Sequence, residues 1–136
     1  MAVNTKTEYA LRALIEIHKN GHISAQKICE AQSLPKKYIE HLLALLKGAG
    51  MVTSSPGSLG GYELSKKPEE ISFADILEAV EDNSFVAGCL VDSGRHCLGE
   101  DCPLSPFFSE LDNRLQEIFR GYNLRDILDF WERKDK

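Results

Sequence analysis

Apolar residues recur every three or four positions in the first third of the chain and predict three helices. The first should run from about Thr5 to Lys19, and Thr5 and Glu8 have the spacing of a capping box at its start. The second is short and should run from Ser24, a suitable N-cap, to about Ala31. The third follows a tight turn and is the most informative of the three.

This third helix separates an apolar face from a polar one. Pro35 suits its first turn, because the fixed φ of proline is compatible with a helix start. An apolar stripe at i, i+3, i+4 and i+7 consists of Ile39, Leu42, Leu43 and Leu46. The polar and basic side chains of the other face and the first turn are Lys36, Lys37, Tyr38, Glu40 and His41. A short helix, a tight turn and such a helix predict a helix-turn-helix that reads the major groove of DNA.

Two short strand-like segments, 51–54 and 61–64, follow the third helix. The residues between them, Pro-Gly-Ser-Leu-Gly at 56–60, have the composition of a hairpin tip. A hairpin directly after a recognition helix is typical of a wing, so Ser55 and Ser58 are expected to approach DNA beside the helix. A small α+β core with solvated lysines is the alternative, but the order of helix, helix, helix and hairpin favours a DNA-binding module.

The second half of the chain predicts three further helices. Ser72 and Asp75 form a capping box before a helix over about 73–81, and Asn123 and Asp126 do the same for the last helix. Between them, a helix opening near Pro103 carries a heptad seam of Leu104, Phe108, Leu111, Leu115, Ile118 and Tyr122. Core packing within the chain is one explanation of this seam, and a symmetric homodimer is the favoured one.

These elements predict a mainly α-helical fold with a small β-hairpin: a winged helix-turn-helix domain plus a long C-terminal dimerisation helix. The expected parts are a DNA-binding module at 1–82, a cysteine-rich loop at 83–103, and the dimerisation and C-terminal helices at 104–136. All three belong to one structural domain, as 136 residues suggest.

The charge distribution supports a DNA partner in spite of the net charge of −5. Residues 1–67 carry nine Lys and Arg against five Glu, a balance of +4, whereas residues 68–136 carry seven against sixteen acidic residues, a balance of −9. This asymmetry fits a DNA-facing half joined to a half that faces solvent or a partner. On charge alone, two solvated surfaces would explain it equally well.

The N-terminus does not resemble a signal peptide, because Arg12 and Glu16 interrupt its apolar positions, and no apolar run is long enough to cross a membrane. We therefore expect a cytoplasmic protein with no membrane partner. In that reducing compartment, clustered cysteines favour metal binding or a redox response over a structural disulfide. Cys29, inside a helical pattern, is expected to be a small buried hydrophobe.

The other three cysteines lie in a stretch without helical or strand periodicity. Seven residues separate Cys89 from Cys97, and four separate Cys97 from Cys102. The stretch spans about 20 residues, and a loop of that length in a compact domain is usually either functional or disordered. Thiolates that bind a soft metal would order it.

Three other interpretations of the cysteines remain open at this point. A closed zinc site needs four good ligands, and His96 is poorly placed to join Cys97 on one ion because the two are adjacent. A cluster-free thiol switch needs a thiol of lowered pKa. An enzyme with a nucleophilic cysteine ranks last, because no phosphate-binding loop or oxyanion motif accompanies the thiols. We expect a protein that is not an enzyme.

Several features together carry a specific resemblance to a known family. They are T-K-T-E-Y-A-L-R-A-L at 5–14, L-P-K-K-Y-I-E-H-L at 34–42, G-G-Y-E-L at 60–64, the helix at 71–80 and three cysteines before a long helix. In these features the chain resembles the winged-helix iron–sulfur transcription regulators, which include IscR-like and NsrR-like proteins. The resemblance implies a homodimeric regulator, a repressor, in which a 4Fe–4S or 2Fe–2S cluster on Cys89, Cys97 and Cys102 tunes binding to a double-stranded DNA operator.

The fourth cluster ligand and the wing depart from parts of that family. The IscR-like branch has a histidine shortly after the third cysteine, where this chain has Ser105. The NsrR-like branch uses an acidic residue from the partner's first helix, and the resemblance implies this role for Glu8, whose spacing from Thr5 also suits a cap. Pro56 replaces a common wing arginine, so minor-groove reading through the wing should be weaker.

Overall fold

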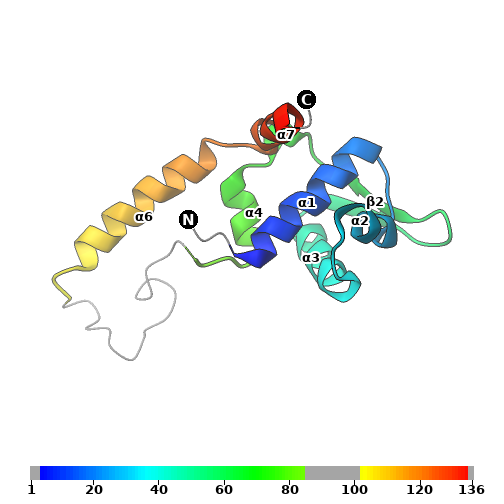
Figure 1. Ribbon diagram of the computed structural model, residues 1–136. Helices are drawn as coiled ribbons and strands as arrows, with labels where there is room; N and C mark the ends of the chain where they lie inside the picture. The colour runs from blue at the N-terminus through cyan, green and yellow to red at the C-terminus, as the bar shows by residue number, and fades with distance from the viewer. Residues whose placement is uncertain (1–3, 85–101, 135–136) are drawn as a thin grey trace.

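The structure, a computed structural model, describes residues 4–84 and 102–134. Its elements in chain order are α1 (Thr5–Asn20), α2 (Ala25–Gln32), α3 (Lys36–Gly48), β1 (Val52–Ser55), β2 (Gly61–Leu64), the 3₁₀ helix η1 (Pro68–Glu70), α4 (Phe73–Ala79), α6 (Ser105–Arg120) and α7 (Leu124–Lys134). Figure 1 shows the first helices gathered around one core, with the hairpin projecting from one end of this body and α6 from the other. The predicted mainly helical fold with a small hairpin is confirmed.

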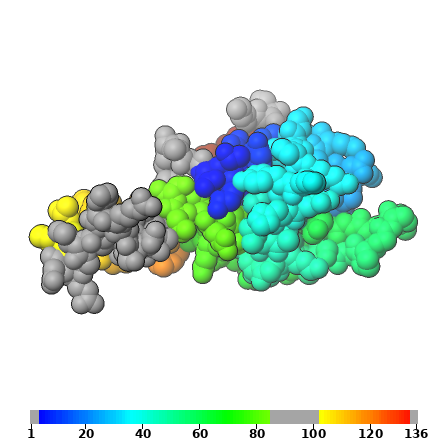
Figure 2. Space-filling model, turned by 90° about the horizontal axis from the view of Figure 1, so that it is seen from below, coloured from blue at the N-terminus to red at the C-terminus, as the bar shows by residue number. Residues whose placement is uncertain are grey.

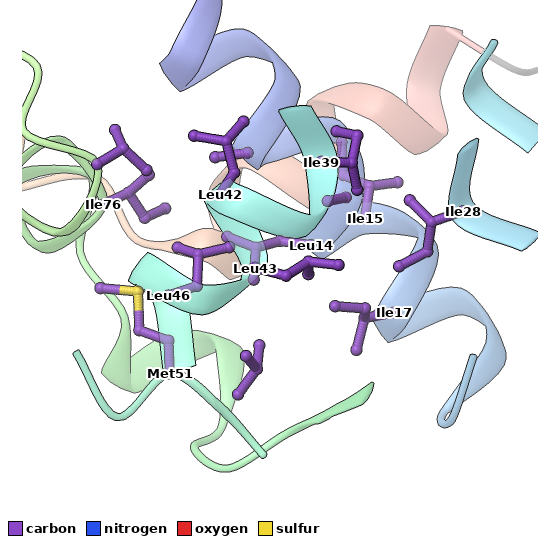
Figure 3. Close-up of a cluster of buried hydrophobic side chains, with 14 of the residues drawn as sticks. Leu14, Ile15, Ile17, Ile28, Ile39, Leu42, Leu43, Leu46, Met51 and Ile76 are labelled. Atoms are coloured by element: carbon purple, nitrogen blue, oxygen red, sulfur yellow. The ribbon is translucent and has the colours of Figure 1, made fainter. Parts of the chain in front are cut away.

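The apolar stripe of α3 is the centre of the core. All four of its predicted residues are fully buried, and they face Leu14 of α1, Ile28 of α2 and Ile76 of α4 (Figure 3). The last helix also contributes to this core, since Leu124 and Leu128 belong to the same buried cluster. Helix α7 therefore packs back onto the core formed by α1, α2 and α3.

The wing is an antiparallel pair in which Val52 lies opposite Leu64 and Ser55 opposite Gly61. The predicted first strand is one residue too early, because the N–H of Met51 still donates to the carbonyl of Leu46 in α3 at 3.0 Å, and β1 begins at Val52. Ile23, just ahead of α2, joins the free side of β2: the N–H of Tyr62 donates to the carbonyl of Ile23 at 2.7 Å, and the reverse bond measures 3.1 Å. This bridge fixes the wing against the helix-turn-helix.

The hydrogen bonds at the helix starts confirm three predicted caps and correct one. Ser24 caps α2, and the boxes at the starts of α4 and α7 form both of their hydrogen bonds. The capping box of Thr5 and Glu8 is wrong, because Asn4 caps α1 by accepting a hydrogen bond from the N–H of Lys6 at 3.0 Å. Asparagine is a stronger N-cap than threonine, so the cap lies one residue earlier than predicted while α1 begins at Thr5, as predicted.

Two predicted helices are shorter in the structure than expected. The helix expected over 73–81 ends at Ala79, and Glu81 adopts a left-handed backbone with φ of 58°. The helix expected to open at Pro103 begins at Ser105. Leu104 and Tyr122 therefore flank α6, and four of the six seam residues lie within it. Among the described residues, 4–84 and 102–134, no helix has both the length and the hydropathy that a membrane span requires.

A buried polar contact ties α1 to the chain after α4. The hydroxyl of Thr7, which is fully buried, donates to the carboxylate of Asp82, which is 6% exposed. The N–H of Ser84 donates to the same carboxylate at 2.9 Å. Burial alone would raise the pKa of Asp82, but the hydrogen bonds from Ser84 and Thr7 outweigh it and hold this pKa below its ordinary value.

Asp82→Ala is therefore expected to lower the free energy of unfolding by about 1–3 kcal/mol, since Thr7 is left with an unpaired buried hydroxyl. A carboxylate whose pKa is lower in the folded state stabilises fully above its unfolded pKa of about 3.9, and this contribution is lost as the pH falls through the folded pKa. Urea unfolding between pH 7 and pH 2.5 should thus show a weaker acid dependence for Asp82→Ala than for the parent. An equal acid dependence in both proteins would contradict the assigned contact.

Candidate nucleic-acid interface

The exposed face of α3 carries the residues predicted to meet DNA. Lys36, Lys37, Glu40 and His41 are all exposed on this helix, opposite the buried stripe. The helix starts after Pro35 without a side-chain cap, so its first backbone N–H groups remain available. Two lysines beside a helix N-terminus form a surface suited to phosphate groups.

A groove runs between α3, the start of α2 and the wing, with a volume of about 730 Å³. It brings together four of the residues predicted to bind DNA: Lys36, Glu40, Ser55 and Ser58. Lys37 and His41 follow Lys36 and Glu40 by one residue each, so they lie beside this groove on the exposed side of α3. We call the groove and this adjoining part of α3 the DNA-facing surface.

The structure adds to this surface residues that sequence reasoning missed. Lys47, near the end of α3, lines the groove, and its ammonium group donates to the hydroxyl of Ser54 in β1 at 2.7 Å. Lys47 follows Glu40 by two helical turns, so both lie on one face of α3, and this spacing could have predicted that Lys47 belongs to the surface. Ser24 and Gln26 enter the groove from the start of α2. No sequence pattern announces these two, because they are positioned by the bridge between Ile23 and Tyr62.

Tyr38 is placed differently from the other predicted residues of α3. It is half-buried, and its ring packs edge-on against that of Tyr9 in α1, with centroids 5.5 Å apart. The guanidinium of Arg12 lies 5.9 Å from the Tyr9 ring. Tyr38 therefore connects the recognition helix to α1, and only part of its side chain faces outward.

A largely buried polar network holds α1 against the end of α2. Arg12 donates from Nε to the side-chain oxygen of Gln32 at 3.0 Å and from its terminal nitrogen to the carbonyl of Gln32. The amide of Gln32 in turn donates to the carboxylate of Glu16 at 2.7 Å. Glu16 and Gln32 are both buried, so their polar groups need these partners. The network fixes the turn that precedes α3.

Glu8 is exposed in the first turn of α1. Its side chain is 61% exposed, it takes no part in capping, and its one charged neighbour is Arg12 at 3.9 Å among the described residues. Ion pairs as exposed as this one contribute little to stability. Figure 1 shows the start of α1 well separated from the start of α6.

Of the three clustered cysteines, the structure describes one. Cys102 is a half-exposed free thiol three residues before α6, whereas Cys89 and Cys97 lie outside the described residues. Within the described ranges, no group of three His, Cys, Asp or Glu side chains gathers to hold a metal. Cys29 is buried, as predicted, and burial raises the pKa of its thiol, with the charge of Glu40 adding to the rise. Cys29 therefore lacks the character of a reactive thiol.

Helix α6 projects from the body (Figure 1), and within the part of the chain that the structure describes it contacts α4 near its last turn. There Phe119 meets Phe73 of α4 edge-on, with ring centroids 5.5 Å apart. Of the predicted seam residues in α6, Leu111 is 42% and Ile118 54% exposed, whereas Phe108 and Leu115 are half-buried. Packing among the described residues therefore leaves the predicted seam partly exposed.

Comparison with known proteins agrees with this geometry. The model of the Rrf2 family, described as iron-dependent transcriptional regulators, matches residues 3–129. The helix-turn-helix type regulator ORF2 of Azotobacter vinelandii is 32% identical over 131 residues, which cover 94% of this chain and 79% of ORF2. The structure of T. potens IscR superposes with a TM-score of 0.76 at 26% identity, covering 100% of this chain and 92% of that one. CymR, the global cysteine regulator of B. subtilis, gives 0.73 at 26% identity, covering 96% and 98%.

Proposed function

The chain belongs to the Rrf2 family of transcriptional regulators, and we propose that it is a homodimeric repressor whose operator binding is controlled by an iron–sulfur cluster. The family membership makes it a DNA-binding transcription regulator of the winged-helix type, and its relatives are regulators rather than enzymes. In this proposal residues 1–82 bind DNA, 83–103 hold the cluster, and 104–136 supply the dimerisation and C-terminal helices.

The DNA-facing surface is the observation that carries the proposal. In this proposal α3 enters the major groove, where Glu40 accepts a hydrogen bond from cytosine and His41 contacts a base or a phosphate. Lys36 and Lys37 neutralise phosphates, and Tyr38 supports this end of the helix. The wing residues Ser55 and Ser58 approach the neighbouring DNA backbone. Lys47, which lines the same groove, adds a further positive charge.

Two substitutions in the DNA-facing surface should have different signatures. Glu40→Ala is expected to relax base preference at one operator position, by about 1–3 kcal/mol, because it removes a base contact. Lys36→Ala should weaken binding to every sequence and flatten the salt dependence of affinity by about one unit of slope, because it removes a phosphate contact. Titrations of parent and variants against an operator and its single-base variants, at several salt concentrations, separate the two effects. Unchanged binding by a Lys36, Lys37 double alanine variant would contradict the placement of α3.

The cluster part of the proposal assigns Cys89, Cys97 and Cys102 as thiolate ligands of a 4Fe–4S or 2Fe–2S cluster. The iron-dependent description of the family and the similarity to T. potens IscR support it. So does the half-exposed thiol of Cys102, which no disulfide engages. When bound, the cluster would supply sensitivity to oxidants, nitric oxide or iron status.

We assign the fourth ligand to Glu8 of the second subunit. Ser105 stands where the IscR-like histidine would be, and a hard carboxylate binds iron more weakly than a thiolate does. The exposure of Glu8, and the separation between the start of α1 and the start of α6 in Figure 1, support a role across the dimer. A ligand on α1 would connect the cluster to α3, because α1 packs against Tyr38 and fixes the turn that precedes α3.

Glu8→Gln is expected to assemble a cluster that is spectrally altered or decays faster, while the free energy of unfolding changes by less than about 0.5 kcal/mol. The fold should tolerate the change because Glu8 does not cap α1 and its pairing with Arg12 is weak. Anaerobic reconstitution followed by visible spectra over time measures the effect. A variant that matches the parent in spectrum and decay rate would remove Glu8 from the ligand set.

The similarity to the global cysteine regulator CymR favours a second candidate, a thiol switch without a cluster. In this alternative two of the three clustered cysteines form a disulfide on oxidation, and the disulfide changes DNA affinity. Anaerobically purified protein separates the possibilities. A brown protein containing iron and sulfide supports the cluster, a colourless protein with one equivalent of zinc supports a structural zinc site, and a colourless metal-free protein supports the thiol switch.

A further inference from the structure

The tip of the wing presents an apolar side chain to solvent beside the DNA-facing surface. Leu59 is 91% exposed, the largest fraction among the exposed large apolar residues of the described ranges. Figure 2 shows the wing, in green at the right, as a projection from the body. The neighbouring residue Ser58 lines the groove of the DNA-facing surface. Leu59 thus lies at the outer edge of the surface proposed to meet DNA.

The backbone that carries Leu59 is tightly constrained. The N–H of Gly60 donates to the carbonyl of Gly57 at 3.0 Å, which makes Ser58 and Leu59 the central residues of a tight turn. Gly57 has a φ of +94°, which favours glycine, and a Cβ on Gly60 would lie 2.2 Å from the carbonyl oxygen of Ser55. Because the turn is already formed, Leu59 needs little ordering when it docks.

The tip carries no charge with which to bind phosphate. Residues 55–60 are Ser, Pro, Gly, Ser, Leu and Gly, and the lysines of the groove, Lys36 and Lys47, lie on α3. Beyond hydrogen bonds from its serines, the tip can contribute burial of the Leu59 side chain. The minor groove offers such burial next to the major groove, and leucine is among the residues that insert there against base steps.

We propose that Leu59 enters the minor groove beside the major groove occupied by α3 and sets a preference for A·T pairs there. The amino group of guanine projects into the minor groove, whereas A·T pairs present only acceptors. Against leucine this amino group would take up space and lose its hydrogen bonds to water. The inference rests on the proposed operator binding. Because Pro56 replaces the wing arginine, minor-groove reading through an arginine was predicted to be weak. Leu59 would give the wing an apolar contact there instead.

Operators are first selected from random DNA with the parent protein. The base pairs under the wing are then located as those whose minor groove the bound protein protects. At that position, A·T, G·C and inosine·cytosine pairs are compared, because inosine lacks the guanine amino group but keeps the major-groove edge. The parent is expected to bind the G·C operator about tenfold more weakly than the A·T operator, which corresponds to about 1.4 kcal/mol. The inosine operator should bind like A·T. Leu59→Ala should bind all three operators equally.

Phe130→Ala is the matched control, since it removes an apolar side chain that is 58% exposed on α7. It should keep the discrimination of the parent. Leu59→Ala should unfold at the same urea concentration as the parent, because the removed atoms lie outside the core. Full discrimination by Leu59→Ala would overturn the inference and leave operator binding standing, whereas a parent that enriches no sequence would overturn both.

Discussion

Replacing Leu111 and Leu115 together by Asp is expected to convert the protein into monomers of about 15.2 kDa and to weaken operator binding by about 100-fold or more. Both residues lie on the seam of α6, where Leu111 is 42% exposed and Leu115 half-exposed in the single chain. In the proposed dimer these positions would be buried, and an unpaired carboxylate there would be strongly unfavourable. The affinity falls because a dimer contacts two half-sites and a monomer contacts one. Sedimentation velocity and operator titration measure the two effects.

The control for this change adds the same charge to α6 away from the seam. Asn113→Asp with Gln116→Glu places two carboxylates on the same helix and should leave the protein dimeric. The core around α1, α2 and α3 does not include Leu111 or Leu115, so the monomeric variant should retain its helical circular dichroism. A folded, soluble Leu111, Leu115 variant that stays dimeric would show that α6 does not form the dimer interface.

Cys102→Ser is expected to reduce the iron content of anaerobically reconstituted protein to about a tenth of the parent value or less, because it removes one of three thiolate ligands. Its fold should persist. Cys102 is half-exposed, and its backbone carbonyl, which the substitution does not alter, accepts the hydrogen bond from the N–H of Ser105 at 3.1 Å. Iron and sulfide analysis gives the cluster content, and urea unfolding of the apo protein tests the fold.

Cys29→Ala is the matched control for that substitution. Cys29 is 8% exposed in the core between the first helices, and its raised pKa disfavours the thiolate that a cluster needs. The control should bind as much iron as the parent while losing some stability, as core truncations do. If Cys29→Ala lost the cluster and Cys102→Ser kept it, the assignment of the ligands would be wrong.

The sequence predicted best the features that depend on contacts close along the chain. The stripe of α3, Ser24 as a cap and the boxes at Ser72 and Asn123 all follow from spacings of three or four residues, and the structure contains them. The error at Thr5 has the same local origin, because Asn4 and Thr5 are both acceptable caps and the stronger one prevails.

Features that depend on distant segments were harder to predict. The bridge from Ile23 to Tyr62 joins residues 39 apart, and no period in the sequence announces it. The same holds for the buried pair of Thr7 and Asp82, because a threonine inside a helical pattern usually reads as a surface residue. The spacing of Lys47 from Glu40 could have placed it on the exposed face of α3, but its contact with Ser54 could not be predicted, because it forms only where β1 lies beside α3.

In the proposed function, cluster occupancy controls operator binding. This control is measured by the Kd of one preparation of the parent for its selected operator, taken under anaerobic conditions with the cluster bound and again after its removal by chelation. Cys102→Ser is titrated alongside. The two Kd values of the parent are expected to differ by about tenfold or more, a coupling of about 1.4 kcal/mol, and chelation should leave the Kd of Cys102→Ser unchanged. Equal Kd values for the cluster-bound and cluster-free parent would show that the cluster does not control operator binding.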